Sequence, residues 1–504
     1  MGLSVARRWE MCKCAIIQYP SLIPRPRGCK VRILAEVTAK YLLYWPKIQP
    51  ILLTRRCDIW YNAHTKSKGE FVVKEALREV MSQFCTDGVP TDAIGRQGRF
   101  PEVRNNATVI KGMRRAGKTY FTYLRMRELL ASGIPLERIV HINFDDERLA
   151  AMTSEDLHLV VDLHSEMFPA AADEKCYYFL DELQNISGWE RFARRLIDSH
   201  RIQLCLTGSS SRMLSQDIAT EMRGRSAEVE IFPLSFTEFL SFNGVFPEPP
   251  ALPDAPRTRG KLKKAFADYM AVGGFPDVQK TDATTRIMML QSYAEAVIYR
   301  DIIERHEIAS VQALKYVLQY LLHNFARKIS VRAISGVLRQ LSLPSDREAL
   351  SNYLSYYSDS YFAYPVPLRT DSLAVRRTNP DKYYLVDTGM IGALKAKNDA
   401  EKGFLLENAV FMELRRGFNK IEYFVTKKGE EVDFFVTDKV TKEMRLVQVS
   451  YEMPKGQTRE REISALRNAR TETGIRKCEI VTWDEEGEED GIRIVPAWKW
   501  FIAK

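Results

Sequence analysis

A glycine-bounded run of eight residues, GMRRAGKT, holds the side chains best suited to chemistry in this sequence. It satisfies the pattern G-x-x-x-x-G-K-[ST], in which the glycines let successive backbone N–H groups face phosphate oxygens. Lys118 is expected to reach the β- and γ-phosphates, and Thr119 to offer its hydroxyl oxygen to Mg²⁺. The residues predicted to hold the nucleotide are Gly112, Arg114, Arg115, Ala116, Gly117, Lys118 and Thr119. The run therefore predicts a site for a nucleoside triphosphate with Mg²⁺; the alternative is a glycine turn without a nucleotide.

Two adjacent carboxylates, Asp181 and Glu182, end a second apolar segment that begins at Cys176. Ligands of open parallel sheets gather at the C-terminal ends of the strands, so Asp181 is expected to bind Mg²⁺, usually through water. Glu182 is expected to polarise the attacking water, which favours hydrolysis over phosphoryl transfer to a small acceptor. The alternative is that the two carboxylates merely begin a solvated helix.

Three more polar residues are candidates for the same reaction. Thr207 and Ser209 follow a further strand-like segment, and either is expected to orient the water beside the γ-phosphate. Arg225 is the candidate for stabilising the charge that develops during hydrolysis, a role that a neighbouring copy often supplies. In that case the chain would form a homo-oligomer, although nothing in the sequence demands a ring. The alternatives are an ordinary hydroxyl-rich turn and a solvated surface arginine.

Strands and helices alternate around these residues. The predicted strands are 107–110, 139–143, 176–180, 203–206 and 228–232, with helical patterns between them. A leading helix near residue 70 is indicated by Val73, Leu77, Val80, Met81 and Phe84, which recur at three- and four-residue spacing. Regular alternation of this kind predicts an α/β fold with a parallel sheet covered on both faces.

The rest of the chain divides into two further regions. Residues 243–260 contain five prolines, too many for a helix or a central strand, and are predicted to link residues 69–242 to the next domain. In the mostly helical region 261–400, Ser330 is expected to cap one helix, and Ser345 to open a second through an S-x-x-E capping box. A strand near residue 361 completes an order that resembles a winged helix. Residues 401–504 are predicted to form a mixed α/β domain.

Composition separates the first part of the chain from the remainder. Residues 1–66 carry 12 Lys and Arg against 3 Asp and Glu, whereas the remaining residues hold 62 of each sign. The net charge of +9 therefore belongs to the opening segment, and the body is balanced. We expect residues 1–68 to be a basic extension that is disordered or follows a mis-assigned start codon. Its four cysteines make a zinc site conceivable, but Cys12-x-Cys14 lacks the common two-residue spacer.

The hydrophobic fraction of 45% and the mean hydropathy of −0.27 exclude a mostly disordered, collagenous or membrane-embedded chain. The opening residues have only a short, broken apolar patch, so we expect no secretory signal, and no apolar run is long enough to span a membrane. We therefore expect a cytoplasmic protein that does not bind membranes.

The sequence resembles bacterial and archaeal AAA-type P-loop ATPases that carry a C-terminal domain of unknown function. The matching strings are GMRRAGKT, HINFDDERL, YYFLDELQNISGWE, LTGSSSRML, RGRSAEVEIFPLSFTEFL, YMAVGGFPDV and KYYLVDTGMIGAL, which together cover most of residues 70–451. The resemblance implies ATP as the nucleotide, an additional-strand, catalytic-glutamate fold, a winged-helix-like module, and a C-terminal segment similar to restriction-endonuclease-like nucleases.

The implied nuclease can be tested against its chemistry. Such enzymes need an acid and then Glu/Asp-x-Lys on the next strand, to bind metal and activate water. Glu407 and Asp433 can supply acids, but the next strand reads Gln448-Val449-Ser450. An amide is a poor Mg²⁺ ligand and serine cannot replace an ammonium, so we expect an inactive nuclease domain. Lys427 or Lys428 taking the place of the missing lysine is the alternative.

These observations support a Mg²⁺-dependent ATPase that uses its nucleotide state to reposition its C-terminal module on an unidentified protein or DNA partner. The alternatives are a nucleic-acid-binding regulator that turns ATP over slowly, and an ATP-coupled nuclease. The winged-helix-like module gives little support for DNA binding, because Arg347 is the only cation of its presumed recognition helix.

Overall fold

The computed structural model describes residues 71–504 except 93–94, 97, 99, 102, 104–105, 172, 210–223, 249–254, 397, 419, 439 and 504. The predicted N-terminal extension and its zinc-site hypothesis lie outside the described residues. The chain divides into two units, residues 1–71 and 72–504, and the second contains the sheets and helices of the fold.

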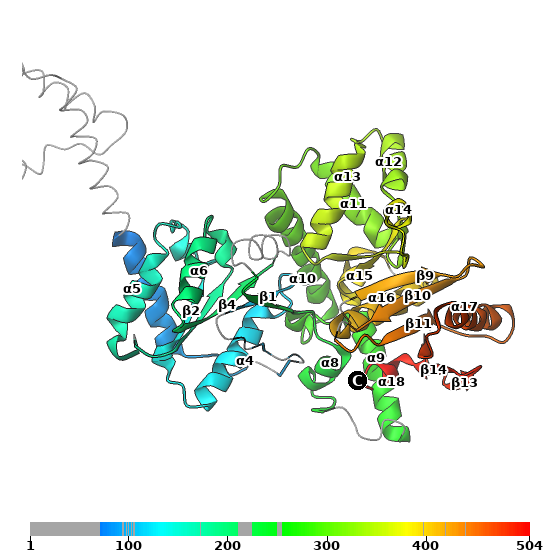
Figure 1. Ribbon diagram of the computed structural model, residues 1–504, viewed down its shortest axis with the longest axis horizontal. Helices are drawn as coiled ribbons and strands as arrows, with labels where there is room; N and C mark the ends of the chain where they lie inside the picture. The colour runs from blue at the N-terminus through cyan, green and yellow to red at the C-terminus, as the bar shows by residue number, and fades with distance from the viewer. Residues whose placement is uncertain are drawn as a thin grey trace, which may run out of the picture. The chain divides into compact units, whose positions relative to one another are not determined.

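A five-stranded parallel sheet carries the predicted phosphate-binding loop (Figure 1). Its strands are β1 (Ala107–Lys111), β2 (Ile139–Asn143), β3 (Cys176–Asp181), β4 (Ile202–Gly208) and β5 (Ser226–Glu230). Their order in the sheet is β2-β3-β4-β1-β5, so β4 lies between the strand that precedes the loop and the strand that ends in Asp181. The predicted α/β fold with an additional strand is thereby confirmed.

Successive side chains of these strands point to opposite faces of the sheet, and each face is covered by helices. The helices are 71–87, α4 (Lys118–Ala131), α5 (His158–Met167) and α6 (Glu190–Asp198). Val109, Leu180 and Leu206 belong to the core formed with α5, α6 and helix 71–87. Ile110 and Phe179 belong to the core formed with α4. Because both faces are buried, the inner strands β1, β3 and β4 are mostly apolar, whereas the edge strand β5 carries Glu228 and Glu230.

A mostly helical region follows the sheet. Its elements are α8 (Phe236–Phe242), α9 (Pro256–Val272), α10 (Ala283–Ala296), the π-helix η7 (Val297–Ile303), α11 (Val311–His323), β6 (Arg327–Ile329), α12 (Val331–Gln340), α13 (Arg347–Asp359), β7 (Ala363–Val366), α14 (Leu373–Thr378), β8 (Asp381–Leu385) and α15 (Thr388–Leu394). The three strands form an antiparallel sheet in the order β6-β8-β7. Ser330 caps α12 as predicted, since its hydroxyl accepts from the backbone N–H of Ala333.

The prediction that Ser345 caps α13 is wrong. The cap is Asp346, whose carboxylate accepts from the backbone N–H of Ala349 at 2.8 Å. Serine and aspartate cap helices about equally well, so the sequence offered two adjacent candidates. The carbonyl of Ser345 instead accepts from the Ser335 hydroxyl, which ties the turn to α12.

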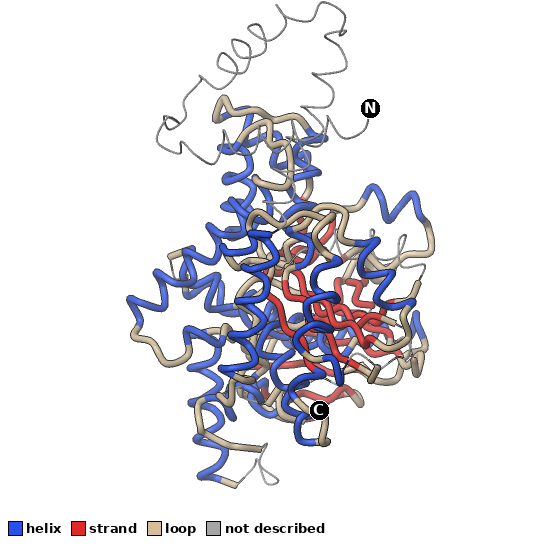
Figure 2. The backbone as a smooth tube through the Cα atoms, turned by 90° about the vertical axis from the view of Figure 1, so that its left-hand side faces the viewer, coloured by secondary structure: helices blue, strands red, loops and turns tan. Residues whose placement is uncertain are grey.

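The last region combines a mixed sheet with helices. Its elements are α16 (Lys402–Gly417), β9 (Lys420–Val425), β10 (Glu431–Thr437), β11 (Met444–Ser450), α17 (Gln457–Thr473), β12 (Cys478–Thr482), β13 (Gly487–Glu489), β14 (Ile492–Pro496) and α18 (Ala497–Trp500). The sheet order is β13-β14-β12-β11-β10-β9. Short 3₁₀ turns occur at Leu136–Arg138, Glu147–Leu149, Pro169–Ala171, Leu183–Asn185, Pro276–Val278 and Asp399–Glu401. Figure 2 shows helices on both sides of the strands.

The helical region and the last region share one hydrophobic core. Phe266 of α9 packs against Phe236 at 5.2 Å and against Phe501 at 5.1 Å, measured between ring centroids. The same cluster extends to Met113 of the phosphate-binding loop. The boundaries at 242, 260 and 400 therefore remain predictions, and no gap in the core of the described residues marks the boundary at 400.

Candidate functional site

The loop from Gly112 to Thr119 joins β1 to α4, as the spacing of the glycines requires. Gly112 and Gly117 have φ angles of 145° and 95°, which side chains rarely tolerate. A Cβ on Gly112 would also collide with the backbone carbonyl of Ile231. The backbone is therefore held in a curl at the N-terminal end of α4, where the helix dipole favours an anion.

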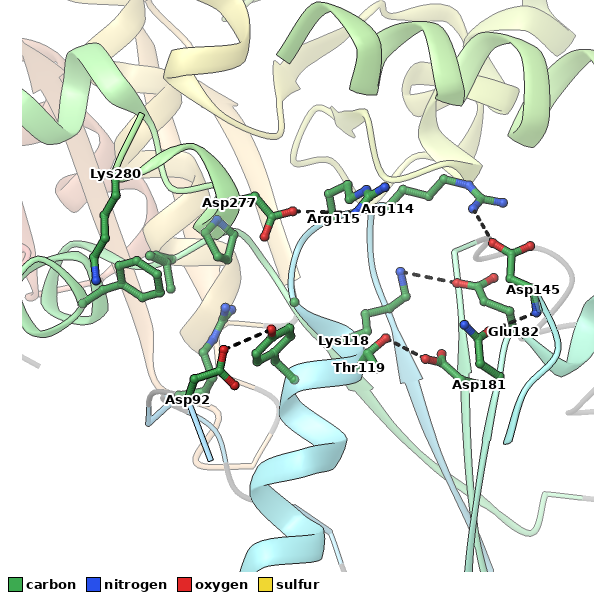
Figure 3. A pocket seen from close by; sticks show the side chains of 17 residues that line it. Asp92, Arg114, Arg115, Lys118, Thr119, Asp145, Asp181, Glu182, Asp277 and Lys280 are labelled. Atoms are coloured by element: carbon green, nitrogen blue, oxygen red, sulfur yellow. Dashed lines mark hydrogen bonds and ion pairs between the residues drawn. The ribbon is translucent and has the colours of Figure 1, made fainter. Parts of the chain in front are cut away.

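Lys118 and Thr119 lie where the sequence predicts them. The buried Lys118 ammonium donates to the carbonyl oxygens of Gly112 at 3.1 Å and Met113 at 3.2 Å. Burial lowers the pKa of Lys118, although the Glu182 carboxylate at 3.9 Å opposes this effect. The Thr119 hydroxyl donates to Asp181 Oδ2 at 2.6 Å (Figure 3). The structure thus brings the loop and the two carboxylates together.

The two carboxylates at the end of β3 are buried and differ in their surroundings. Burial, followed by the negative charge of Glu182, raises the pKa of Asp181 to about 6. Glu182 has a φ of 53°, an unusual value for a residue with a side chain, and strain of this kind concentrates at functional sites. The amide of Gln184 donates to Glu182 Oε2. This contact, together with Lys118, fixes the direction of the Glu182 carboxylate.

The side chains at this junction suit a magnesium triphosphate. A Mg²⁺ site built with a substrate phosphate needs few protein oxygens, and the Thr119 hydroxyl and the Asp181 carboxylate provide them side by side. The described residues contain no group of three or more His, Cys, Asp or Glu side chains arranged to hold a metal alone. The loop glycines, the ammonium and these two oxygens therefore fit a metal that is shared with phosphate.

A cavity of about 660 Å³ extends from the loop. Near the loop it is lined by Arg114, whose guanidinium lies 3.7 Å from the Asp145 carboxylate, and by Arg115, which lies 3.8 Å from Asp277. Figure 3 shows Lys280 and Asp92 at the other end of the cavity. Its remaining lining includes Tyr120, Leu234, Phe242 and Pro276. Apolar surface beside charged groups gives the cavity room for both a base and phosphates.

Thr207 and Ser209 lie at the same edge of the sheet but contact different groups. The buried Thr207 hydroxyl donates to Asp181 and accepts from the backbone N–H of Glu182 at 3.2 Å. The buried Ser209 hydroxyl donates to Asp301 Oδ1 at 3.0 Å. Of the two candidates for orienting water, Thr207 is therefore the one that contacts the carboxylate pair.

The structure does not bring Arg225 to this cavity. Arg225 precedes β5, and its carbonyl accepts from the backbone N–H of Ala107, the first residue of β1. It therefore lies at the opposite end of the parallel strands from the loop, paired with the exposed Asp198 at 2.6 Å. Only an arginine supplied to a second copy would retain the predicted role.

Glu407 and Asp433, the two acids of the implied nuclease, contact a lysine that was not predicted from the sequence. Lys382 of β8 donates to Glu407 at 2.7 Å and to Asp433 at 3.0 Å, and it lies 3.0 Å from Glu431. Burial disfavours the charged lysine, but these carboxylates raise its pKa well above the ordinary value. Burial and then Asp433 raise the pKa of Glu407 to about 7. An ammonium thus lies between the acids.

Lys427 and Lys428 do not take that place. The backbone N–H of Lys427 donates to Glu472, and the Lys428 ammonium donates to Asn468 at 3.1 Å, on the exposed side of α17. Gln448 accepts from the backbone N–H of Asp433 and donates to Glu462 at 2.7 Å. Lys427 and Lys428 therefore do not contact the acids, and the inactive nuclease remains a prediction.

Three residues that contact the predicted functional residues were not identified from the sequence. They are Gln184, which contacts Glu182, Asp301, which contacts Arg114, and Lys382, which contacts Glu407. Gln184 follows Glu182 by two residues, and the αL conformation that brings them together has no signal in residue type. Asp301 and Lys382 are far along the chain from their partners. Only a three-dimensional contact reveals them.

The sheet order and the loop geometry define a P-loop α/β nucleotide-binding protein. Comparison with family models agrees, since residues 104–240 match an AAA domain and residues 263–401 match a domain of unknown function, DUF8612. An uncharacterised protein of Methanocaldococcus jannaschii is 33% identical over 426 residues, covering 81% of this chain and 91% of that protein. An uncharacterised Haemophilus influenzae protein is 28% identical over 78% of this chain and 94% of its own. The chain belongs to the family of AAA-domain proteins that includes the archaeal relative.

Solved structures give weaker matches. Drosophila ORC bound to AT-rich DNA and Cdc6 matches at a TM-score of 0.18 and 11% identity, covering 67% of this chain and 97% of that chain. C. elegans PCH-2 matches at a TM-score of 0.20 and 13% identity, over 58% and 68%. We infer no function from matches at these scores. Within the described residues, no helix is both long and apolar enough to traverse a bilayer.

Proposed function

We propose that the chain hydrolyses ATP with Mg²⁺ and uses its nucleotide state to reposition its C-terminal regions on a partner. The observation that carries this proposal is the grouping of Lys118, the Thr119–Asp181 pair and Glu182 at one end of the sheet. The resemblance to AAA-type ATPases favours adenine over guanine as the base.

Each side chain has a separate task in this proposal. The loop N–H groups and the Lys118 ammonium bind phosphate oxygens, while Thr119 and Asp181 hold the metal. Mg²⁺, once bound there, supplies positive charge that offsets the charge developing on the phosphates. Glu182 accepts a proton from the attacking water, and Gln184 keeps its carboxylate in the orientation needed to do so. Thr207 steadies Asp181.

Phosphate release is the test. Glu182→Gln keeps the shape of the side chain but removes the base, so release is expected to fall at least about 100-fold while ATP binding persists. Glu174→Gln is the matched control, because Glu174 is exposed near the other end of β3. If the unaltered chain binds ATP but releases no phosphate, the slow-turnover regulator is favoured instead. If Glu182→Gln no longer binds ATP, the loss of phosphate release does not identify Glu182 as the base.

The helical region is proposed to contact the partner through a winged-helix-like module. The order α11, β6, α12, α13, β7, β8 and the sheet order β6-β8-β7 support that interpretation. Near the β7–β8 connection, Arg369 and Arg376 pair with Glu422 at 3.3 Å and 3.6 Å. Because α13 carries only Arg347 and these arginines are partly neutralised, we favour a protein partner over DNA.

A further inference from the structure

A carboxylate from the helical region reaches the phosphate-binding loop. Asp301 lies in η7, and its side chain is 1% exposed. The Arg114 Nε–H donates to Oδ1 at 3.1 Å and to Oδ2 at 3.0 Å, and the Ser209 hydroxyl donates to Oδ1 at 3.0 Å. The guanidinium of Arg305, four residues further along the chain, lies 3.4 Å from Asp301 Oδ1. One buried carboxylate therefore joins the loop, the end of β4 and η7.

The electrostatics show how much the carboxylate depends on these donors. Burial raises the pKa of Asp301, while Arg114 and then Arg305 oppose the rise. For Arg114, burial disfavours the charge, but the carboxylates of Asp301, Glu182 and Asp145 together outweigh burial, and the pKa of Arg114 is raised. A buried carboxylate left without its cation is costly, so a change in the position of Arg114 is felt at Asp301.

The element that carries Asp301 is suited to transmit such a change. The π-helix is rare, and where it interrupts an α-helix it is frequently found at a functional site. Here it continues α10 directly and precedes α11, the first helix of the winged-helix-like module. Met113 of the loop lies in the same hydrophobic cluster as Val297 and Ile302 of this element. The loop and η7 are thus joined directly by the Arg114–Asp301 contact, and both contribute side chains to one extended hydrophobic cluster.

Arg114 also lines the cavity beside Lys118 and Glu182. The Arg114 Nη1 atom lies 3.7 Å from Asp145 Oδ2, which leaves the guanidinium within the site where phosphates are proposed to bind. We propose that Asp301 is a positioning residue through which the helical region senses the bound phosphates, because Asp301 and a triphosphate both draw on the Arg114 guanidinium. This inference rests on the proposed binding of ATP.

The substitution Asp301→Asn removes the charge and keeps the shape. Arg114 then loses its buried carboxylate partner and keeps only the longer contact with Asp145 at 3.7 Å, so it is freer to bind phosphate, and a repelling charge is lost from the site. ATP affinity is expected to rise about five- to tenfold relative to ADP affinity, within the usual range of coupling between sites. If Asp301 had a merely structural role, the substitution would lower the affinities for ATP and ADP equally, or it would lower the melting temperature. Asp268→Asn, on the exposed side of α9, is the matched control and should leave the ratio unchanged.

Hydrogen exchange reports the coupling directly. The experiment uses the full chain carrying Glu182→Gln, which is expected to bind ATP without turning it over, and compares residues 297–303 with Mg²⁺-ATP, with Mg²⁺-ADP and without nucleotide. We expect ATP to change exchange in this segment by at least about twofold, and Asp301→Asn to abolish that change while ATP still binds. If Asp301→Asn does not fold, Arg114→Met removes the other partner of the same contact and is expected to abolish the change in exchange as well.

The outcomes separate the two proposals. Exchange in residues 297–303 that is the same with and without bound ATP would overturn the role of Asp301 and leave ATP hydrolysis standing. A full ATP-dependent change that persists in Asp301→Asn would overturn that role as well. An unaltered chain that binds no ATP would overturn both proposals. Additive effects of Arg114→Met and Asp301→Asn on the affinity ratio would also contradict the inference, since residues acting through one contact are not additive.

Discussion

The stability of the nucleotide-binding sheet should depend on pH through one histidine, His141 of β2. Its imidazole packs between Phe84 and Tyr123, with ring centroids 5.4 Å from each. Its Nε2 is buried and has no hydrogen-bond partner among the described residues. Burial lowers the pKa of His141 from 6.5 to about 4. The ring is therefore neutral in the folded state at pH values where the unfolded chain already takes up a proton.

The sign and the size of the effect follow from linkage. Because the folded pKa is depressed, the unfolded chain binds more protons below pH 6.5, and stability falls as the pH decreases toward 4. At pH 5 the loss is about 2 kcal/mol, and near pH 4 it approaches about 3 kcal/mol, at about 1.36 kcal/mol for each pKa unit. At pH 8 the contribution is close to zero. For a domain of this size, a change of about 2 kcal/mol corresponds to about 4–8 °C in melting temperature.

His141→Phe is the variant that isolates this group. Phenylalanine keeps an aromatic ring against Phe84 and Tyr123 but cannot take up a proton. We compare the melting temperature of the variant minus that of the unaltered chain at the two pH values. This difference is expected to be about 4–8 °C larger at pH 5 than at pH 8. Melting is followed by circular dichroism at both pH values. Parallel melting profiles of the two proteins between pH 8 and pH 5 would refute the reasoning, because they would show that His141 takes up a proton as readily when folded.

Two further predictions concern the ion cluster of the last region and the base at the end of β3. Lys382→Met leaves Glu407 and Asp433 without their cation and should destabilise the chain by about 3–5 kcal/mol at pH 8. Thermal melting should show a smaller loss at pH 5, because the carboxylates can then be protonated; an equal loss at both pH values would contradict the charge argument. Gln184→Leu should lower the rate of phosphate release about 10- to 100-fold with ATP affinity unchanged, because Glu182 loses its orienting donor. An unchanged rate would show that Lys118 alone orients the base.

The sequence predicted the parts of the fold that short-range patterns specify. The glycines at 112 and 117 indicate a curled loop whatever surrounds it, because few other residues adopt those φ angles. The apolar runs of β1 and β3 indicate strands buried on both faces, and that placed Asp181 and Glu182 at the C-terminal edge of the sheet. The contact between Thr119 and Asp181 then follows from the topology alone.

What the sequence did not predict depends on distance along the chain. Arg225 was a candidate on residue type alone, yet the direction of β5 places it at the far end of the sheet from the loop. Asp301 and Lys382 find their partners only when separate regions pack together, and nothing in a run of residues marks an aspartate as the partner of an arginine 187 positions away. Charged residues are common on surfaces, so burial is the property that distinguishes these two, and burial is not local.

The two buried clusters share a chemistry but differ in what can reach them. In both, a cation from one region compensates carboxylates from another, which makes each cluster costly to break. Lys382 is 4% exposed and is paired with Glu407, Glu431 and Asp433, so an anion from solvent competes poorly for it. The Arg114 side chain is 17% exposed and lines the cavity of the phosphate-binding loop, so a ligand can compete for it. The same kind of ion pair therefore holds the last region together at one site and can be switched by a nucleotide at the other.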